Sequence, residues 1–210
     1  WKKPKYWPYP VSISFGQPLQ HVDNVNIVRD AVLHLTTQSV LLRKERSMIP
    51  ARRFIRQCRL AWSRTKVADS GGTELTGGKL LIGSLAFHSL LTKKILKPDV
   101  QYVGLLLPPS VGGVLGNTAL ALAGKVTVNL NYTLTEELVN YCIREAGIKQ
   151  VLTSRAFMEK RPMNLDAEVI CLEDLKQQIT GIDKAKAFAT AKLMPIGMLV
   201  RQLGLDRIKA

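Results

Sequence analysis

The chain has 210 residues, 46% of them hydrophobic and 22% charged, a composition that excludes a disordered or a fibrous protein. Lys and Arg outnumber Asp and Glu by 30 to 16, which gives a formal net charge of +14 at pH 7. The three cysteines, Cys58, Cys142 and Cys171, are too few and too scattered for a disulfide framework, so a reduced cytosolic compartment is the simplest interpretation.

The first 66 residues are predicted to form one strand and two helices. Alternating apolar residues predict a strand over residues 11–15, closed by a turn. Apolar residues at helical spacing predict a helix over residues 23–45 and a second over residues 51–66. Arginines surround one face of the second helix, which we interpret either as a solvated basic surface or as a surface that meets anionic lipid.

The positive charge is concentrated in this N-terminal part. Residues 1–66 contain 13 Lys and Arg against 3 Asp and Glu, a net charge of +10, whereas residues 67–210 have a net charge of +4. Near Lys66 the sequence also changes from polar and basic to apolar and rich in glycine, so a domain boundary is expected there. Because Trp1 stands in place of Met, we expect the chain to begin within a longer protein.

Helices alternate with strands in the remainder of the chain. A hairpin is expected around Gly71 and Gly72, followed by an amphipathic helix over residues 79–96. Further strands are predicted over residues 102–107, 126–130, 150–153 and 168–172. Helices between them, over residues 111–123 and 133–147, complete a pattern that predicts an α/β fold with a parallel, doubly wound sheet.

Three local features refine this prediction. Thr133 and Glu136 form a capping-box pattern at the start of the last of these helices. The uncharged run over residues 100–124 is broken by prolines and glycines, which favours a strand, a loop and a helix over a membrane span. Residues 184–203 are predicted to be helical and apolar with an interruption at Pro195, and a core helix is favoured over a partner-binding or interfacial one.

No complete catalytic or phosphate-binding motif is found in the sequence. The loop over residues 107–113 joins a strand to a helix, where backbone N–H groups can bind an anion, but its spacing fits a structural turn better. The glycine-rich stretch of residues 69–79 does not have the spacing of a phosphate-binding P-loop. Structural roles are expected for His21, His34 and His88, which have no partner in catalytic spacing, and no nucleic-acid motif is found.

Residues 66–175 resemble the first subdomain of the adenylate-forming (AMP-binding) acyl-activating enzymes. The resemblance rests on Leu107-Pro108-Pro109-Ser110 after a strand, on Ala123-Gly124 at a helix end, and on Leu130-Asn131 after the next strand. It extends upstream to Glu74-Leu75-Thr76, where Gly77 replaces the usual aromatic residue. It implies a protein that activates a fatty acid with ATP and magnesium and transfers the acyl group to acyl carrier protein or coenzyme A.

A second resemblance concerns the N-terminus. Residues 9–19 are similar to the last conserved motif of the glycerolipid acyltransferases, a strand followed by Gly16 and Pro18, and these two residues are the candidate site residues. An acyltransferase followed by an adenylate-forming domain is the arrangement of the bacterial bifunctional 2-acylglycerophosphoethanolamine acyltransferase/acyl-acyl-carrier-protein synthetases. The implied domains are an acyltransferase end at residues 1–22, a basic connector at 23–66, and the adenylate-forming part at 67–210.

The resemblance also implies what the protein acts on and where. Lysophospholipid and an anionic membrane surface are the expected further partners, on the cytoplasmic side of the cell membrane, and no nucleic acid is expected. The catalytic motifs of both families are absent from the sequence, so no catalytic, cofactor-binding or metal-binding residue is assigned, and the chain alone is expected to be inactive. The alternatives are an ordinary acyl-coenzyme A synthetase with a basic extension and a non-enzymatic module that binds RNA or lipid.

Overall fold

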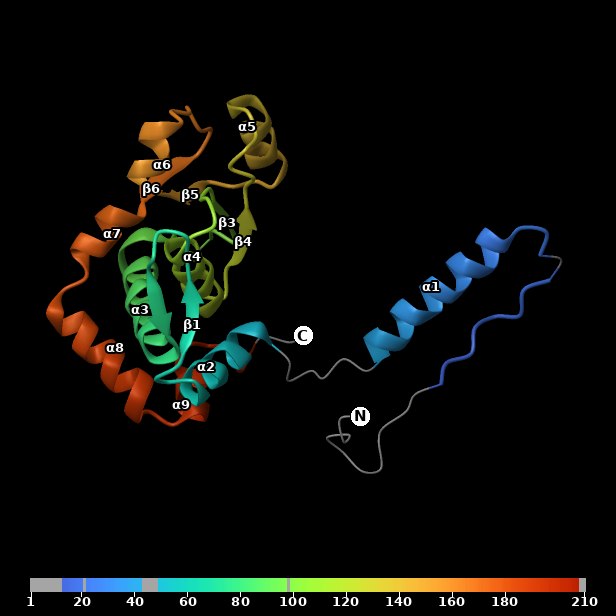
Figure 1. Ribbon diagram of the computed structural model, residues 1–210, viewed down its shortest axis with the longest axis horizontal. Helices are drawn as coiled ribbons and strands as arrows, with labels where there is room; N and C mark the ends of the chain where they lie inside the picture. The colour runs from blue at the N-terminus through green and yellow to red at the C-terminus, as the bar shows by residue number, and fades with distance from the viewer. Residues whose placement is uncertain (1–12, 21, 43–48, 98, 208–210) are drawn as a thin grey trace. The chain divides into compact units, whose positions relative to one another are not determined.

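The computed structural model describes residues 13–20, 22–42, 49–97 and 99–207 (Figure 1). The chain divides into two compact units, residues 1–48 together with Ala210, and residues 49–209. The break therefore lies ahead of the boundary that the change in composition near Lys66 predicts.

In the first unit, the described residues form one helix, α1 (Val25–Leu42), and a segment without regular structure over residues 13–20. The helix predicted over residues 23–45 is thus confirmed within the described range. The predicted strand is not formed at residues 13–15, and residues 11 and 12 lie outside the described residues. A strand needs a hydrogen-bonded neighbour, and this segment instead contacts α1, where Ser39 Oγ donates to Ser14 Oγ at 2.6 Å.

The second unit opens with α2 (Pro50–Leu60) and a hairpin of two antiparallel strands, β1 (Thr65–Ala68) and β2 (Glu74–Thr76). The hairpin confirms the prediction around Gly71 and Gly72. The predicted helix, in contrast, stops before residue 66. The residues that follow α2 bind the start of the next helix instead of continuing α2 itself. The Gly77 N–H donates to Ala61 O at 3.2 Å, and the Gly78 N–H donates to Trp62 O at 2.9 Å.

A four-stranded parallel sheet forms the centre of the second unit, with the strand order β4-β3-β5-β6. Its strands are β3 (Tyr102–Leu105), β4 (Val126–Asn129), β5 (Gln150–Thr153) and β6 (Glu168–Cys171). Within this sheet, β3 comes first in the chain and has later strands on both sides, as in a doubly wound sheet. The predicted α/β fold with a parallel sheet is therefore confirmed.

Helices cover both faces of this sheet. They are α3 (Gly77–Leu90) with the π-helical turn η1 (Leu91–Ile95), α4 (Val111–Leu122), α5 (Glu136–Glu145), α6 (Arg155–Lys160) and α7 (Leu172–Gln178). One apolar cluster joins Val103 and Leu152 of the sheet to α3, α4 and α7. Another joins Leu106 and Val151 to α5 and α6, so the sheet is the middle of three layers.

The capping box predicted at Thr133 is wrong. Both the N–H and the hydroxyl group of Thr133 donate to Asn131 Oδ1, at 3.0 and 2.8 Å, which makes Thr133 part of a turn. The helix α5 begins three residues later, with Thr135 as its N-cap residue, and Glu136 accepts from the backbone of Asn164 instead.

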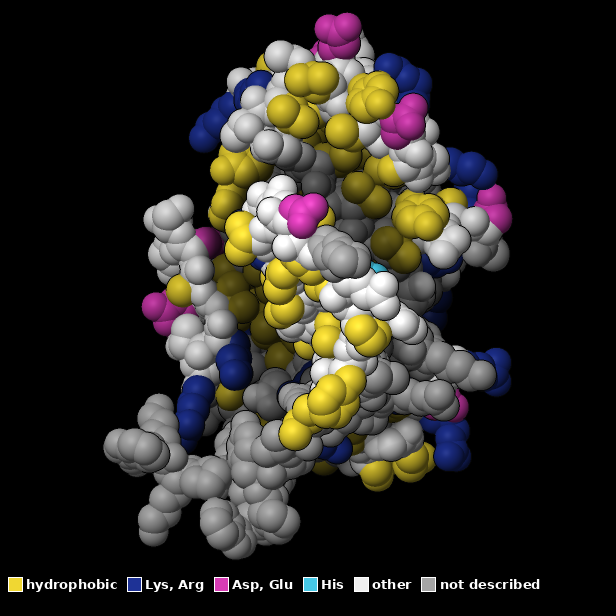
Figure 2. Space-filling model, turned by 90° about the vertical axis from the view of Figure 1, so that its right-hand side faces the viewer, with side chains coloured by type: hydrophobic (Ala, Val, Ile, Leu, Met, Phe, Trp, Pro, Cys, Tyr) yellow, Lys and Arg dark blue, Asp and Glu magenta, His cyan; other side chains and the backbone are white. Residues whose placement is uncertain are grey.

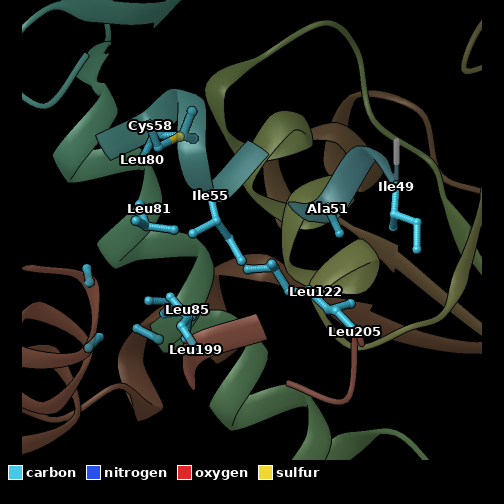
Figure 3. Close-up of a cluster of buried hydrophobic side chains, with 13 residues drawn as sticks. Ile49, Ala51, Ile55, Cys58, Leu80, Leu81, Leu85, Leu122, Leu199 and Leu205 are labelled. Atoms are coloured by element: carbon cyan, nitrogen blue, oxygen red, sulfur yellow. The ribbon is translucent and has the colours of Figure 1, made fainter. Parts of the chain in front are cut away.

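A separate helical layer contains α2 and the last two helices, α8 (Gly181–Leu193) and α9 (Ile196–Gln202). Ile55 of α2 is fully buried and lies toward Leu81 of α3 and Leu122 of α4 (Figure 3). Leu199 of α9 lies beside Leu85, so the C-terminal segment contributes to the core and is interrupted at Pro195 as predicted, but Phe188 and Met198 on it are exposed.

The packing of α2 also corrects the interpretation of its arginines. Arg56 is exposed as predicted, but the guanidinium group of Arg59 binds backbone carbonyl oxygens at the end of α8, and that of Arg52 binds the carbonyl oxygen of Leu205, after α9. On the face that Figure 2 presents, Lys and Arg side chains and apolar side chains both reach the surface. In the described part of the chain, no helix combines the length and the apolar composition that a membrane span needs.

Candidate functional site

A cavity of about 600 Å³ opens at the carboxyl ends of β3 and β4, the edge at which parallel α/β sheets hold their ligands. The hairpin of β1 and β2 forms one wall and α4 forms another. Its apolar lining includes Leu105, Leu107, Pro108, Pro109, Val114 and Leu130. Its polar lining includes Asp69, Ser110, Asn117, Asn129 and Asn131.

Asp69 fixes the hairpin to the start of α4. Its Oδ1 accepts hydrogen bonds from the backbone N–H groups of Gly71 and Thr73, both at 3.0 Å, and its Oδ2 accepts from the Val111 N–H at 3.1 Å. These bonds, the one from Val111 foremost, lower the pKa of the Asp69 carboxyl group because they stabilise its charged form. Asp69 is thus a structural link between two walls of the cavity.

The loop between β3 and α4 satisfies its own backbone donors. Ser110 is the N-cap residue of α4, and its Oγ accepts from the Gly113 N–H at 3.1 Å. Together with the bond from Val111 to Asp69, two N–H groups of the first turn of α4 are bound to side chains of this chain. This geometry favours the predicted structural turn over an anion-binding loop.

Two asparagines at the mouth of the cavity hold α4 to the end of β4. Asn117 Nδ2 donates to Asn129 Oδ1 at 2.9 Å, and Asn129 Nδ2 donates to Asn117 Oδ1 at 3.4 Å. Amide groups of this kind can exchange their mutual bonds for bonds to a polar ligand. The titratable side chains of the lining are Asp69, whose carboxylate is bound to backbone N–H groups, and Tyr132.

The candidate residues from the sequence lie elsewhere. Gly16 and Pro18 are exposed residues of the segment 13–20 in the first unit, whereas the cavity belongs to the second unit. A Cβ atom at Gly16 would lie 3.5 Å from Leu35 Cδ2 of α1, an ordinary contact distance. The local geometry therefore leaves the role of these two residues a prediction.

The remaining chemically versatile side chains are not assembled into a centre. Cys58, Cys142 and Cys171 are free, and burial raises the pKa of the Cys58 thiol to about 11. His88 is partly buried, which lowers its pKa, and His21 lies outside the described residues. Within the described ranges, no group of three or more His, Cys, Asp or Glu side chains could hold a metal ion.

Sequence reasoning did not single out Asp69, Asn117 or Asn129. A signal for Asp69 exists, because an aspartate two residues before a Gly-Gly pair is typical of a side chain that binds the backbone of a turn. Asn129 is the last residue of β4 and lies near the end of the predicted strand, at the edge where ligands bind. Asn117 has no such signal, because nothing in the helix pattern indicates that it faces Asn129.

Comparisons with known structures agree on the fold. The N-terminal subdomain of NpsA from Klebsiella oxytoca, in complex with 3-hydroxybenzoyl-AMSN, matches with a TM-score of 0.54 and 16% identity over 61% of this chain and 32% of that chain. O-succinylbenzoate coenzyme A synthetase (MenE) from Bacillus subtilis, in complex with AMP, matches with a TM-score of 0.50 and 18% identity over 60% of this chain and 32% of that chain.

A third match is the nonribosomal peptide synthetase FmoA3 in its AMPPNP-bound form, with a TM-score of 0.56 and 17% identity over 65% of this chain and 15% of that chain. No protein-family model matches the chain. The chain spans about a third or less of the length of these neighbours. Its fold is that of the N-terminal subdomain of adenylate-forming enzymes.

Proposed function

We propose that the chain is part of an ATP-dependent ligase that activates a carboxylic acid as its adenylate. The observation that carries the proposal is the parallel sheet β4-β3-β5-β6 with a cavity at its carboxyl edge, in a fold shared with enzymes bound to AMP or an ATP analogue. In the reaction, the carboxylate oxygen attacks the α-phosphorus of ATP and pyrophosphate leaves. A thiol sulfur then attacks the acyl carbon, which forms a thioester and releases AMP.

The contribution of this chain is positional. Asp69, Ser110 and the Asn117–Asn129 pair hold the hairpin, α4 and β4 together around the ligand cavity. Magnesium accompanies ATP in this proposal through the phosphate oxygens, which are its usual ligands. The described residues have no cluster of carboxylates suited to hold it, so no step is assigned to a metal ion bound by this chain.

For the substrates we propose a fatty acid and, as the thiol acceptor, acyl carrier protein or coenzyme A. The neighbours support a thiol acceptor of one of these kinds, since they include a coenzyme A synthetase and an adenylation domain artificially fused to a PCP domain. Their acids differ from one another. Fatty acid as the acid therefore rests on the resemblance of the sequence.

We further propose an acyltransferase half that uses lysophospholipid at an anionic membrane on the cytoplasmic side. Gly16 and Pro18 would belong to the end of that half at residues 1–22, followed by a basic connector, and the ligase part would include α2 with the rest of the second unit, residues 49–209. Support comes from the resemblance of residues 9–19 and from the net charge of +10 in residues 1–66.

Two assays on the protein encoded by the complete open reading frame test the proposal. We expect exchange of labelled pyrophosphate into ATP that depends on palmitate, and transfer of an acyl group to lysophosphatidylethanolamine. The 210-residue chain should support neither reaction. Exchange with an aryl acid but not with palmitate would contradict the proposal that the acid is a fatty acid. Failure of acyl transfer alone would contradict the proposed acyltransferase half. Absence of exchange with every acid would contradict the proposed ligase activity.

A further inference from the structure

A second cavity, of about 430 Å³, lies between α3, η1, α8 and α9 and shares no lining residue with the cavity at the sheet edge. α3 and α8 run side by side here (Figure 1). The floor is apolar, because Leu85 of α3, Ala187 of α8 and Leu199 of α9 line it and are all buried. Figure 3 shows Leu85 and Leu199 next to each other.

The rim of this cavity carries two lysines and one aspartate, and therefore a net positive charge. Lys93 of η1 and Lys186 of α8 both line it and are exposed. Neither ammonium group forms a hydrogen bond or an ion pair with another residue that the structure describes. The Asp183 carboxylate also lines the cavity, and its Oδ2 accepts from the N–H and the hydroxyl group of Thr180, at 3.0 and 2.7 Å. These neutral donors leave its negative charge in place, and it attracts Lys186 and Lys93, so the two lysines exceed it by one positive charge.

The backbone at Lys93 is also unusual. η1 is a π-helical turn that continues α3, and such turns are rare and occur frequently at functional sites. Thr92 and Lys93 of this turn line the cavity, together with His88 one turn earlier. A smaller cavity of about 100 Å³ adjoins it and shares Lys93 and Asp183, so the hollow continues along α3 toward the start of α8.

From this combination we infer that the groove between α3 and α8 is a second binding site, for a small amphipathic anion with a carboxylate or phosphate head and a short alkyl chain. The alkyl chain would lie on Leu85 and Leu199, and the head would lie between Lys93 and Lys186. A volume of about 430 Å³ with an apolar floor and a few polar groups is typical of a small-molecule site. This inference does not rest on the proposed ligase activity.

Calorimetric titration of the 210-residue chain tests the inference with octanoate, octyl phosphate, acetate and 1-octanol as probes. We expect octanoate or octyl phosphate to bind at millimolar concentrations or below, and acetate and 1-octanol to bind at least about tenfold more weakly, because each lacks one half of the recognition. Comparison of the two anions identifies the head group. Amide chemical shifts should change at Thr92, Ala187 and Thr190.

Matched variants locate the binding. Lys93→Gln and Lys186→Gln should each weaken octanoate binding about tenfold, whereas Lys184→Gln, an exposed lysine of α8 that does not line the cavity, should leave it unchanged. Ala189→Trp, at an exposed lining position, should block it. Equal binding of 1-octanol, equal losses in Lys184→Gln and Lys186→Gln, or no binding of either anion by the folded chain would overturn the inference.

Discussion

Arg59 Nη2 in α2 donates a hydrogen bond to the backbone carbonyl oxygen of Met194, the residue at which α8 ends. The same nitrogen donates to Thr190 O at 3.1 Å, and Arg52 Nε donates to Leu205 O, beyond α9, at 2.9 Å. The last carbonyl groups of a helix have no partner within it and carry partial negative charge, so Arg59 stabilises the end of α8, whereas Arg52 binds the chain after α9. The arginines of α2 thereby join the first helix of the second unit to its last two.

Replacing Arg59 with Gln should destabilise the second unit. The charge-assisted bonds to the end of α8 are lost, and we expect the free energy of unfolding to fall by about 1.5 kcal/mol. Urea denaturation, monitored by circular dichroism, measures this free energy of unfolding. Arg56→Gln on the exposed side of α2 is the matched control and should change the stability by less than about 0.5 kcal/mol. An equal effect of both variants would mean that helix capping is not the cause.

The sequence predicts most of the second unit because its helices and strands have strong local patterns. Val139 and Ile143 recur at helical spacing and are buried, and the strand at Val103 belongs to a continuous apolar run. What it does not predict depends on partners distant in the chain. The acceptor of Arg52 lies 153 residues away, and the two acceptors of Arg59 lie 131 and 135 residues away. The sequence of a basic helix cannot indicate acceptors at such distances.

The same reasoning explains the two local errors. The alternation of apolar and polar residues over residues 11–15 indicates which side chains would share a face, but a strand forms only where a second strand pairs with it. At Thr133, the hydroxyl group that a capping box would use donates instead to the side chain of Asn131, only two residues away. Of the cavity, the sequence predicts the structural turn over residues 107–113 that lines it, but not the pairing of Asn117 with Asn129.

The buried position of Ile55 sets the start of the folded unit. Ile55 is fully buried, so Ile55→Ala should lower the free energy of unfolding by about 3 kcal/mol through the cavity that it leaves. Leu60→Ala on the same helix is the control, since 74% of Leu60 is exposed, and it should have little effect. A chain that begins at Ile49 should keep the cooperative unfolding transition, whereas one that begins at Val67 should lose it. Cooperative unfolding of both would mean that α2 is dispensable.

Gly77 lies where the chain passes close to the end of α2. A Cβ atom at this position would lie 2.5 Å from the carbonyl oxygens of Cys58 and Ala61, both backbone atoms that cannot turn away. We expect Gly77→Ala to cost about 2 kcal/mol of stability in thermal or urea unfolding. At Gly181, the first residue of α8, a Cβ atom meets nothing within 4 Å, so Gly181→Ala should be neutral or stabilising. Equal stability of the two variants would contradict this account.

The lowered pKa of Asp69 predicts a pH dependence. The folded-state pKa lies below the ordinary value of 3.8, so the carboxylate contributes stability above that value and loses it as the pH falls through the folded pKa. Asp69→Asn should therefore destabilise the protein at neutral pH and flatten the acid limb of a plot of urea midpoint against pH. Asp206→Asn, at an exposed position after α9, serves as the control. An unchanged acid limb in Asp69→Asn would show that the link to Val111 contributes nothing to stability.

The Cys58 thiol should be protected by its burial. A pKa of about 11 leaves only about one thiolate in a thousand at pH 8, and the thiolate is the reactive form. Native protein should therefore react at Cys58 with a thiol-specific disulfide reagent far more slowly than protein in urea, where the side chain meets water and the ordinary value of 9.0 applies. The slow phase of labelling should be absent in Cys58→Ser, which would assign that phase to Cys58. It should remain in Cys142→Ser, because Cys142 is at a half-buried position. Rapid labelling of Cys58 in the folded chain would contradict the packing of α2 against α3, because only opening of that contact exposes the sulfur.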